Sequence, residues 1–359
     1  MKSFNKHRKS IILADCEKEE VEEFAEGFKA VTGDEIFINS KICNGSHGKA
    51  ANFRRYFIYA VYPFYFVMKS RQYKYVIGWQ QFFALFYVFY CRLFHIKKRN
   101  IVIAVNFTYK SKAGFAGKIY KCFMGYCVRN EYLDYIHVLS YNYAKICAKE
   151  FGISKNKFIV TPFGIPDTYE KWKKTKVEYN NYSFSIGRSN RDFDFLVNAW
   201  GRMPENELLV IASDTFCPKK KLPVNVIHRR DIIGDAQFPY IANCKAMIIP
   251  IDDGTICSGD TVLLKAMSYE KLVAVTVPST LGEMYIDDGK DGLLIKKDLK
   301  KFVDIFSKEI NSDSAKEIGI SARKSFLKKF SRYAMGKNLC QLLKYKREIN
   351  YFENIETDN

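Results

Sequence analysis

At 359 residues, with 48% hydrophobic and 27% charged side chains, the chain has an ordinary globular composition and enough length for two hydrophobic cores. Its ten cysteines include no CxxC pair, and no histidine lies at ligand spacing from Cys122 and Cys127, which favours free thiols over a zinc site or a disulfide framework. Residues 11–14 are too short an apolar run for a signal peptide, and no run reaches the roughly 20 apolar residues of a spanning helix, so a cytoplasmic protein is expected.

The net charge of +18 is concentrated in one segment. Residues 36–130 contain no Asp or Glu but 16 Lys or Arg, and 18 aromatic residues fall between Phe53 and Phe94. Three explanations are open: an anionic membrane surface, a nucleic acid, or a large aromatic core beneath a solvated basic face. The segment contains no known nucleic-acid-binding motif, so we expect no nucleic acid and favour peripheral attachment to the inner face of the cell membrane.

The first half of the chain alternates predicted strands and helices. Strands are expected at 11–14, 36–39, 75–78, 101–105, 136–140 and 158–162, with a helix at 17–30, a loop at 44–48 and long aromatic helices over most of 50–95. The stretch 101–105 is wholly apolar and rich in β-branched residues, which is typical of a buried parallel strand. Strands that alternate with helices predict a parallel sheet. His47 in the 44–48 loop is a candidate to line a cleft, and an exposed loop histidine is the alternative.

The strand and helix pattern pauses in a breaker-rich stretch at 161–166 and then begins again. Strands are expected at 182–186, 208–212, 224–227, 246–250, 273–277 and 293–295, followed by helices from 300 to about 350. The sequence therefore predicts an α/β fold of two doubly wound Rossmann-like domains that face a cleft, with C-terminal helices crossing back to the first domain. The expected boundaries are an N-terminal domain at 1–165, a linker at 166–179, a C-terminal domain at 180–330 and a helical tail at 331–359.

The first predicted strand of the second half runs directly into Gly187. Glycine lets the chain turn tightly at the strand tip, and Arg188 and Arg191 then project where a phosphate would lie in a doubly wound domain. A guanidinium group binds phosphate in bidentate fashion and keeps its charge. The alternative is that both arginines are surface residues paired with Asp192 or Asp194.

A second candidate element, Ser258-Gly259-Asp260-Thr261, begins a predicted helix after the strand at 246–250. A helix N-terminus with small residues presents free N–H groups and a favourable dipole to an anion. The alternative is an ordinary N-cap by Ser258 or Thr261. Asp260 weakens the anion interpretation because its carboxylate would compete for the same N–H groups, unless it points away or contacts a sugar hydroxyl.

Together, these stretches resemble the family 4 glycosyltransferases, which have the GT-B fold. Residues 186–200 resemble the Gly-Arg signature of that family, and residues 250–273 resemble its donor-site segment. Residues 287–295 resemble the Gly-rich segment that usually follows, and residues 161–167 resemble the stretch between the two domains. The four pieces occur in matching order and spacing over roughly 135–330.

The resemblance implies a hexosyltransferase-like enzyme that transfers a sugar from a nucleotide-diphosphate donor to a glycan or lipid-linked acceptor in cell-surface polysaccharide synthesis. It also implies a retaining reaction that needs no metal and no cofactor. The C-terminal domain would bind the nucleotide sugar through Gly187, the helix start at 258–261 and the two arginines, with Arg188 and Arg191 stabilising the leaving diphosphate. The N-terminal domain would bind the acceptor and face the membrane.

The sequence also departs from the family pattern in its donor segment. Members commonly carry a Glu-x7-Glu pair there, but the corresponding residues are Cys257 and Lys265, and Glu270 stands where a glycine is common. Lys265 would reach a phosphate of the donor instead, or mark a changed donor. The histidine often found at a strand end of the N-terminal domain is replaced by Asn106. The alternative function is therefore a non-catalytic GT-B-like subunit that binds a sugar nucleotide, a glycan or a partner enzyme.

Overall fold

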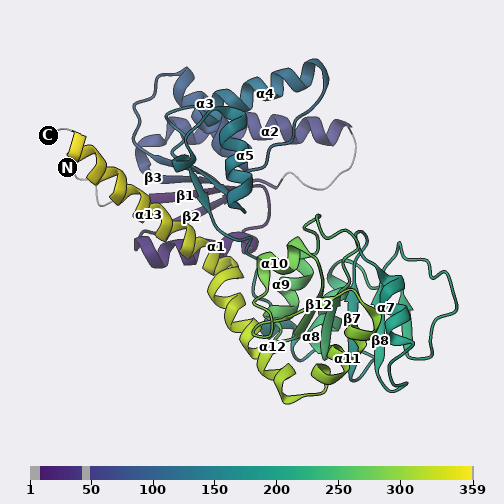
Figure 1. Ribbon diagram of the computed structural model, residues 1–359. Coiled ribbons are helices and arrows are strands. Elements are labelled where there is room, and N and C mark those ends of the chain that lie inside the picture. The colour runs from purple at the N-terminus through teal and green to yellow at the C-terminus, as the bar shows by residue number, and fades with distance from the viewer. Residues whose placement is uncertain (1–8, 43–48, 358–359) are drawn as a thin grey trace. The chain divides into compact units, whose positions relative to one another are not determined.

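The structure is a computed structural model that describes residues 9–42 and 49–357 (Figure 1). The chain forms two compact units. Unit 1 comprises Met1–Pro166 with Arg332–Asn359, and unit 2 comprises Asp167–Ser331. The C-terminal helix thus returns to the first unit, as the sequence predicts. The expected linker residues from 167 onward belong to unit 2, and the predicted 44–48 loop with His47 lies outside the described residues.

Unit 1 is built on a parallel sheet in the order β2-β1-β3-β4-β5-β6. Its elements are β1 (Lys9–Ala14), α1 (Glu19–Thr32), β2 (Ile36–Ser40), α2 (Lys49–Met68), β3 (Tyr73–Gly78), α3 (Gln81–Leu93), β4 (Ile101–Ala104), α4 (Gly114–Val128), β5 (Tyr135–Val138), α5 (Tyr141–Phe151), β6 (Phe158–Val160) and α13 (Arg332–Thr357). Short turns of helix occur at Ser70–Gln72 and Lys155–Lys157. The predicted aromatic helices are α2 and α3, and α2 continues through Pro63.

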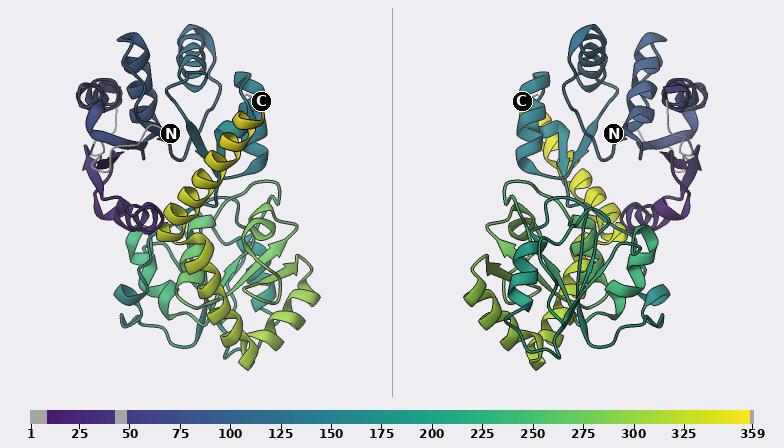
Figure 2. Two further views of the ribbon diagram at one scale, coloured as in Figure 1. Left: turned by 90° about the vertical axis from the view of Figure 1, so that its left-hand side faces the viewer. Right: turned by 90° about the vertical axis from the view of Figure 1, so that its right-hand side faces the viewer.

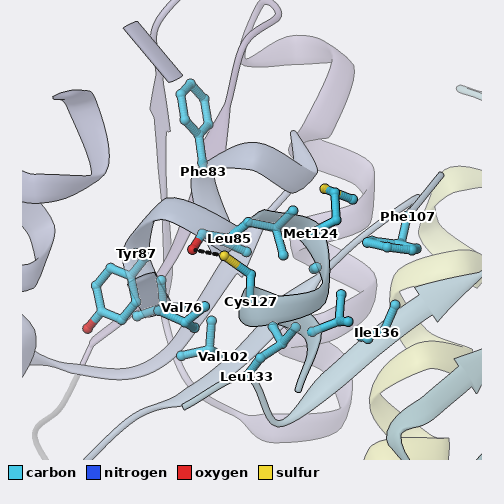
Figure 3. Close-up of a cluster of buried hydrophobic side chains, with 14 of the residues drawn as sticks. Val76, Phe83, Leu85, Tyr87, Val102, Phe107, Met124, Cys127, Leu133 and Ile136 are labelled. Carbon is cyan, nitrogen blue, oxygen red and sulfur yellow. Dashed lines mark hydrogen bonds between the residues drawn. The ribbon is translucent and has the colours of Figure 1, made fainter. Parts of the chain in front are cut away.

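The two faces of this sheet bury two separate cores because strand side chains alternate in direction. Ile11 and Leu13 of β1 face a core formed with α2, α3, α4 and α5. Ile12 and Ala14 face the opposite core, formed with α1 and α13. Figure 3 shows part of the first core, in which the Cys127 Sγ donates to the carbonyl of Leu85 at 3.4 Å. Packing against this one face of the sheet therefore explains most of the aromatic residues in the segment.

Helices α1 and α13 pack closely because glycines occupy their contact (Figures 1 and 2). A methyl group on Gly27 would lie 2.0 Å from the carbonyl oxygen of Tyr333, and one on Gly336 would lie 2.1 Å from that of Phe24. Both distances are shorter than any real contact, so the backbones meet only where side chains are absent. This packing explains why the C-terminal helix belongs to unit 1.

Unit 2 contains a second parallel sheet, in the order β12-β11-β10-β7-β8-β9. Its elements are α6 (Tyr169–Trp172), β7 (Tyr182–Ile186), α7 (Phe193–Trp200), β8 (Leu208–Ala212), β9 (Val226–Arg229), α8 (Gln237–Asn243), β10 (Ala246–Ile249), α9 (Asp260–Ser268), β11 (Leu272–Val277), α10 (Thr280–Tyr285), β12 (Leu293–Lys296), α11 (Leu299–Ile310) and α12 (Asp313–Ser325). A short 3-10 turn at Gly234–Ala236 precedes α8, and a π-helical turn at Phe326–Phe330 follows α12. Trp200, Phe302 and Phe306 are buried in the core on one face of the sheet. The predicted fold class, two doubly wound Rossmann-like domains, is confirmed.

Candidate functional site

The candidate site lies at the carboxyl end of β7 in unit 2, where the order of the sheet reverses. The chain builds β8 and β9 on one side of β7 and then returns to build β10, β11 and β12 on the other. In open parallel sheets, ligands bind beyond the carboxyl ends of the strands at such a reversal. Loop 187–192 follows β7 and loop 250–259 follows β10, so the two loops that carry most of the predicted site residues meet here.

The side chain of Arg191 is enclosed between two glycines. A methyl group on Gly187 would lie 2.7 Å from the Arg191 Cγ, and one on Gly259 would lie 2.1 Å from its Nη2. The Nε atom donates to the carbonyl of Ile186 at 3.4 Å, and Nη1 donates to the carbonyl of Asn190 at 3.0 Å. Both glycines are therefore required for the guanidinium group to reach the start of α9.

Arg191 stays a cation in spite of its burial. Desolvation lowers the pKa of Arg191 to about 10, and the carboxylate of Asp260 opposes that shift, so the group is protonated at pH 7. Its Nη1 approaches the Oγ and the carbonyl oxygen of Ser258 at 3.4 and 3.5 Å, whereas Nη2 has no hydrogen-bond partner within the described parts of the chain. A partly desolvated cation attracts an anion more strongly than the same group in water.

Asn190 connects the two loops, and the sequence analysis did not include it in the site. Its amide nitrogen donates to the carbonyls of Asp253 and Ile256 at 3.1 and 3.3 Å and to the Ser258 Oγ at 3.0 Å. Its Oδ1 accepts the backbone N–H of Asp253 at 2.7 Å. Its φ of 55° lies in the left-handed region, which asparagine tolerates better than most residues. An asparagine directly after Gly-Arg-Ser is the one feature of the sequence that indicates a tight turn here, and thus a residue able to connect the two loops.

Arg188 lies on the opposite side of the loop and is largely exposed. Its Nε and Nη2 donate to the two carboxylate oxygens of Asp214, just after β8, at 3.0 and 2.8 Å. The alternative partners weighed from the sequence are engaged elsewhere, since Asp192 pairs with Lys297 and Asp194 pairs with Lys219. An exposed pair of this kind contributes about 0–1 kcal/mol, so a ligand phosphate can replace Asp214 at little cost.

The start of α9 has no side-chain cap, which differs from the N-cap alternative for Ser258 or Thr261. The N-cap residue is Gly259, with a φ of 100°. The Oδ1 of Asp260 accepts the backbone N–H of Thr261 at 2.9 Å, so this carboxylate competes with an anionic ligand for that N–H group. The Ser258 Oγ accepts from Asn190 and Arg191. Gly187, Arg191, Ser258, Gly259 and Asp260 are thus brought together, with Arg188 at the rim.

Comparison with known proteins identifies the architecture. The chain matches no family profile, and no curated protein is significantly similar to it in sequence. Solved structures are similar over nearly its whole length. A glycosyltransferase from Rickettsia africae is 13% identical with a TM-score of 0.57, covering 95% of this chain and 98% of that one. HepE of Anabaena, in complex with UDP, is 12% identical with a TM-score of 0.56, covering 94% and 100%. The galactosyltransferase WaaB of the lipopolysaccharide outer core is 14% identical with a TM-score of 0.56, covering 94% and 99%. The chain has the GT-B fold.

Within this GT-B chain, Lys265 lies apart from the other predicted site residues. It is buried in the last turn of α9, where its Nζ donates to the Thr168 Oγ1 at 2.9 Å. The Thr168 hydroxyl is also 2.7 Å from the Tyr269 hydroxyl, and the Lys265 ammonium lies 5.2 Å from the centre of the Phe238 ring. Glu270, five residues further along the chain, has a φ of 60°, a conformation that the glycine common in family 4 would adopt freely.

The basic, aromatic segment of the GT-B chain leaves an apolar surface on unit 1. Phe53, Phe57, Val61, Phe64 and Met68 form an exposed stripe along α2, and Phe53 is 74% exposed. Phe115 and Ile119 are likewise exposed on α4. This helix lies on the side of the sheet that carries α2 and α3 (Figure 1). Of the helices in the described ranges, none combines the length and the apolar character that crossing a bilayer needs.

Proposed function

We propose that the protein is a glycosyltransferase that takes a sugar from a nucleotide-diphosphate donor, bound at the reversal point of unit 2. The observation that carries this proposal is the Arg191 guanidinium, which is buried between Gly187 and Gly259 yet charged, beside the uncapped start of α9. A fixed cation and free N–H groups at a strand end form a site for an anion such as a diphosphate. The GT-B fold and its nucleotide-sugar-using neighbours support the choice of ligand.

In this proposal the arginines act on the charge that develops when the sugar leaves the diphosphate. Arg191 is already desolvated and held by its neighbours, so it needs no rearrangement at the moment of reaction. Arg188 exchanges its Asp214 partner for the phosphate. The Ser258–Thr261 helix start adds N–H contacts, although the Asp260 Oδ1 accepts the N–H of Thr261. We further propose a retaining, metal-independent transfer, on the resemblance of these segments to family 4.

We propose that the acceptor is a glycan or a lipid-linked sugar used in polysaccharide synthesis, and that unit 1 binds it at the cytoplasmic face of a membrane. The support is the exposed stripe on α2 and α4, within a segment that carries 16 basic and no acidic residues. Aromatic rings enter the headgroup region of a bilayer, and basic residues near an anionic surface contribute about 1 kcal/mol each.

A non-catalytic GT-B-like subunit is the second candidate function, and one observation favours it. Both positions of the usual Glu pair have changed, and Lys265 is occupied by contacts with Thr168 and Phe238. A site that had lost its ribose contact would still bind a nucleotide weakly without turning it over.

The test measures nucleotide binding first and transfer second. We expect UDP or another nucleoside diphosphate to bind the full chain by titration calorimetry, and Arg191→Met to weaken that binding. Arg202→Met is the matched control because Arg202 is an exposed arginine of the same unit, outside the site. A screen of nucleotide sugars with lipid-linked acceptors then separates the candidates. Turnover supports the enzyme, and binding without turnover supports the subunit. Failure of every nucleotide to bind excludes the proposed donor site.

A further inference from the structure

A second polar pocket lies at the corresponding position of unit 1. The sheet order reverses between β1 and β3, and the loops after β1, β3 and β4 leave from the carboxyl ends of adjacent strands. A pocket of about 420 Å³ opens there and is lined by Asp15, Arg55, Tyr59, Gln80 and Asn106. Small-molecule pockets in proteins commonly measure about 300–1,000 Å³. None of these residues belongs to the proposed donor site in unit 2.

Two buried polar atoms in the wall of this pocket have no hydrogen-bond partner in the described chain. They are the Nε donor of Arg55 and the Oδ1 acceptor of Asn106. Arg55 forms a hydrogen bond with Asn52 through Nη2 at 3.1 Å, but no carboxylate of the described chain pairs with it. Buried polar atoms are nearly always paired, and leaving one unpaired lowers the stability of the fold. An unpaired donor and an unpaired acceptor in one pocket wall therefore suit a ligand that carries both kinds of group.

Asp15 supplies an oriented carboxylate to the lining of the same pocket. Its Oδ2 accepts from the Tyr59 hydroxyl at 2.5 Å and from the Gln80 Nε2 at 3.1 Å, and Gln80 also reaches the Tyr59 hydroxyl at 3.2 Å. The second carboxylate oxygen, Oδ1, has no partner among the residues that the structure describes. A carboxylate held by two donors with one free oxygen is suited to accept a ligand hydroxyl.

The backbone of Asn106 is held in one conformation by the neighbouring strand β5. Its φ is 52°, and its backbone N–H donates to the Nδ1 of the buried His137 at 3.1 Å. Asparagine adopts this left-handed conformation more readily than most residues, and the contact with His137 holds it there. The side-chain amide therefore lies in the pocket wall, and its Oδ1 has no hydrogen-bond partner among residues 9–42 and 49–357.

We propose that this pocket binds a sugar that carries an anionic substituent, a carboxylate or a phosphate. The anionic group pairs with Arg55, and ring hydroxyls donate to Asp15 and Asn106. A nucleoside diphosphate fits this pocket poorly because Asp15 would face it, whereas a hydroxyl-rich ring with one charged group satisfies both unpaired atoms. The absence of acidic residues from 36 to 130 favours an anionic ligand on the same unit. On the proposed function, which this step requires, that sugar is the acceptor.

The experiment compares three probes on the full chain by titration calorimetry: methyl glucuronide, glucose 6-phosphate and methyl glucoside. We expect both anionic sugars to bind, or only the one whose substituent fits, at least about 10-fold more tightly than the neutral glucoside. One charge-assisted hydrogen bond corresponds to a change of about 10- to 100-fold in affinity. Equal binding of the glucoside, or binding of none of the three, overturns the proposal.

Matched variants locate the binding. Arg55→Gln should weaken the anionic sugars by about 10-fold or more, and Arg54→Gln, its exposed neighbour on α2, should leave them unchanged. Asp15→Asn should weaken anionic and neutral sugars alike. Circular dichroism and thermal unfolding of each variant report that unit 1 remains folded, and UDP binding is measured in parallel. Loss of sugar binding in Arg54→Gln as well as Arg55→Gln would indicate a diffuse charge effect and contradict the pocket. Sugar binding without nucleotide binding would overturn the proposed donor site alone.

Discussion

The Nδ1 atom of His137 accepts the backbone N–H of Asn106 at 3.1 Å, which fixes the protonation of a fully buried imidazole. Because Nδ1 accepts, the proton of the neutral ring must be on Nε2, which lies 2.8 Å from the Thr161 Oγ1. The imidazole thus connects β5 to the ends of β4 and β6. A second proton would place two N–H groups face to face and remove this connection.

This relationship predicts a pH dependence of stability. Burial lowers the pKa of His137 to about 4, below its ordinary 6.5 in the unfolded chain. Between these values the unfolded state binds a proton that the folded state does not, so stability is complete above pH 6.5 and falls as the pH drops toward 4. The pKa difference corresponds to a loss of about 3 kcal/mol. Urea unfolding of the wild type and of His137→Gln across this range should show a steeper fall in the wild type, and parallel curves would contradict the assignment.

The enclosure of Arg191 predicts that two small substitutions act through it. Gly259→Ala places a methyl group 2.1 Å from the Nη2 of Arg191 and should displace the guanidinium, weakening UDP binding by about 10-fold or more. Gly234→Ala is the control, since Gly234 also has a positive φ but open space around it. Both variants place a methyl group at a positive φ, but only Gly259→Ala meets Arg191, so equal nucleotide affinity in both would show that Arg191 does not contact the nucleotide.

The two arginines should differ in their effect on transfer. Arg191→Met removes a buried charge from the reacting group and should lower kcat/KM by about 100- to 1,000-fold. Arg188→Met removes an exposed charge already shared with Asp214 and should cost about 10-fold. Asp214→Asn frees Arg188 and should leave nucleotide affinity equal or higher. A kinetic series in which Arg188→Met is the more damaging change would place the diphosphate at the rim of the loop.

The sequence was sufficient to predict the fold, and most of the residues that it named as a candidate site lie together at the carboxyl end of β7. Apolar runs such as 101–104 and 246–249 predicted their strands because buried parallel strands tolerate little else. The strand expected at 224–227 lies two residues later, at Val226–Arg229. The second half of this strand is polar, so it pairs in the sheet without the apolar pattern from which strands are predicted. Element boundaries of this kind depend on tertiary contacts.

The contacts that complete both candidate sites were beyond prediction. Asn190 hydrogen-bonds to residues more than 60 positions away, and Arg188 pairs with Asp214 rather than with the nearby Asp192 or Asp194. Such partners depend on how strand ends meet, and hydrophobic periodicity carries no information about that. The pocket at Asp15 was likewise missed because its residues come from three strand ends and a helix.

Lys265 separates the two candidate functions. Lys265→Met keeps the volume and the contact with Phe238 but removes the ammonium group that bonds to Thr168. If the changed Glu position serves an active enzyme, transfer or donor preference should change by about 10-fold while UDP binding persists. Lys265→Glu restores the common residue and should alter donor choice in the same assay. Unchanged transfer and donor preference in both variants would show that Lys265 takes no part in donor binding, and a loss of thermal stability alone would assign it a structural role.

The exposed stripe on α2 and α4 predicts binding to anionic membranes. Phe53 and Phe115 are 74% and 80% exposed, an unfavourable state for large rings that insertion between headgroups relieves. Basic residues of the same segment are expected to contribute to binding an anionic membrane, but some of them already have other contacts. Lys98 pairs with Asp134 and Arg55 lines the pocket, which leaves Arg54, Lys97 and Lys118 among the exposed ones.

We therefore expect cosedimentation with vesicles that contain anionic lipid, weak binding to neutral vesicles, and release as salt shortens the screening length to a few Å. Phe53→Ser with Phe115→Ser should reduce partitioning by about 10-fold or more, because each buried ring contributes about 1.5–3 kcal/mol. Phe37→Ser, which changes an exposed ring on β2 instead, is the control. Equal partitioning to neutral and anionic vesicles would remove the electrostatic component. A control variant as weak as the double variant would show that α2 and α4 do not form the contact surface.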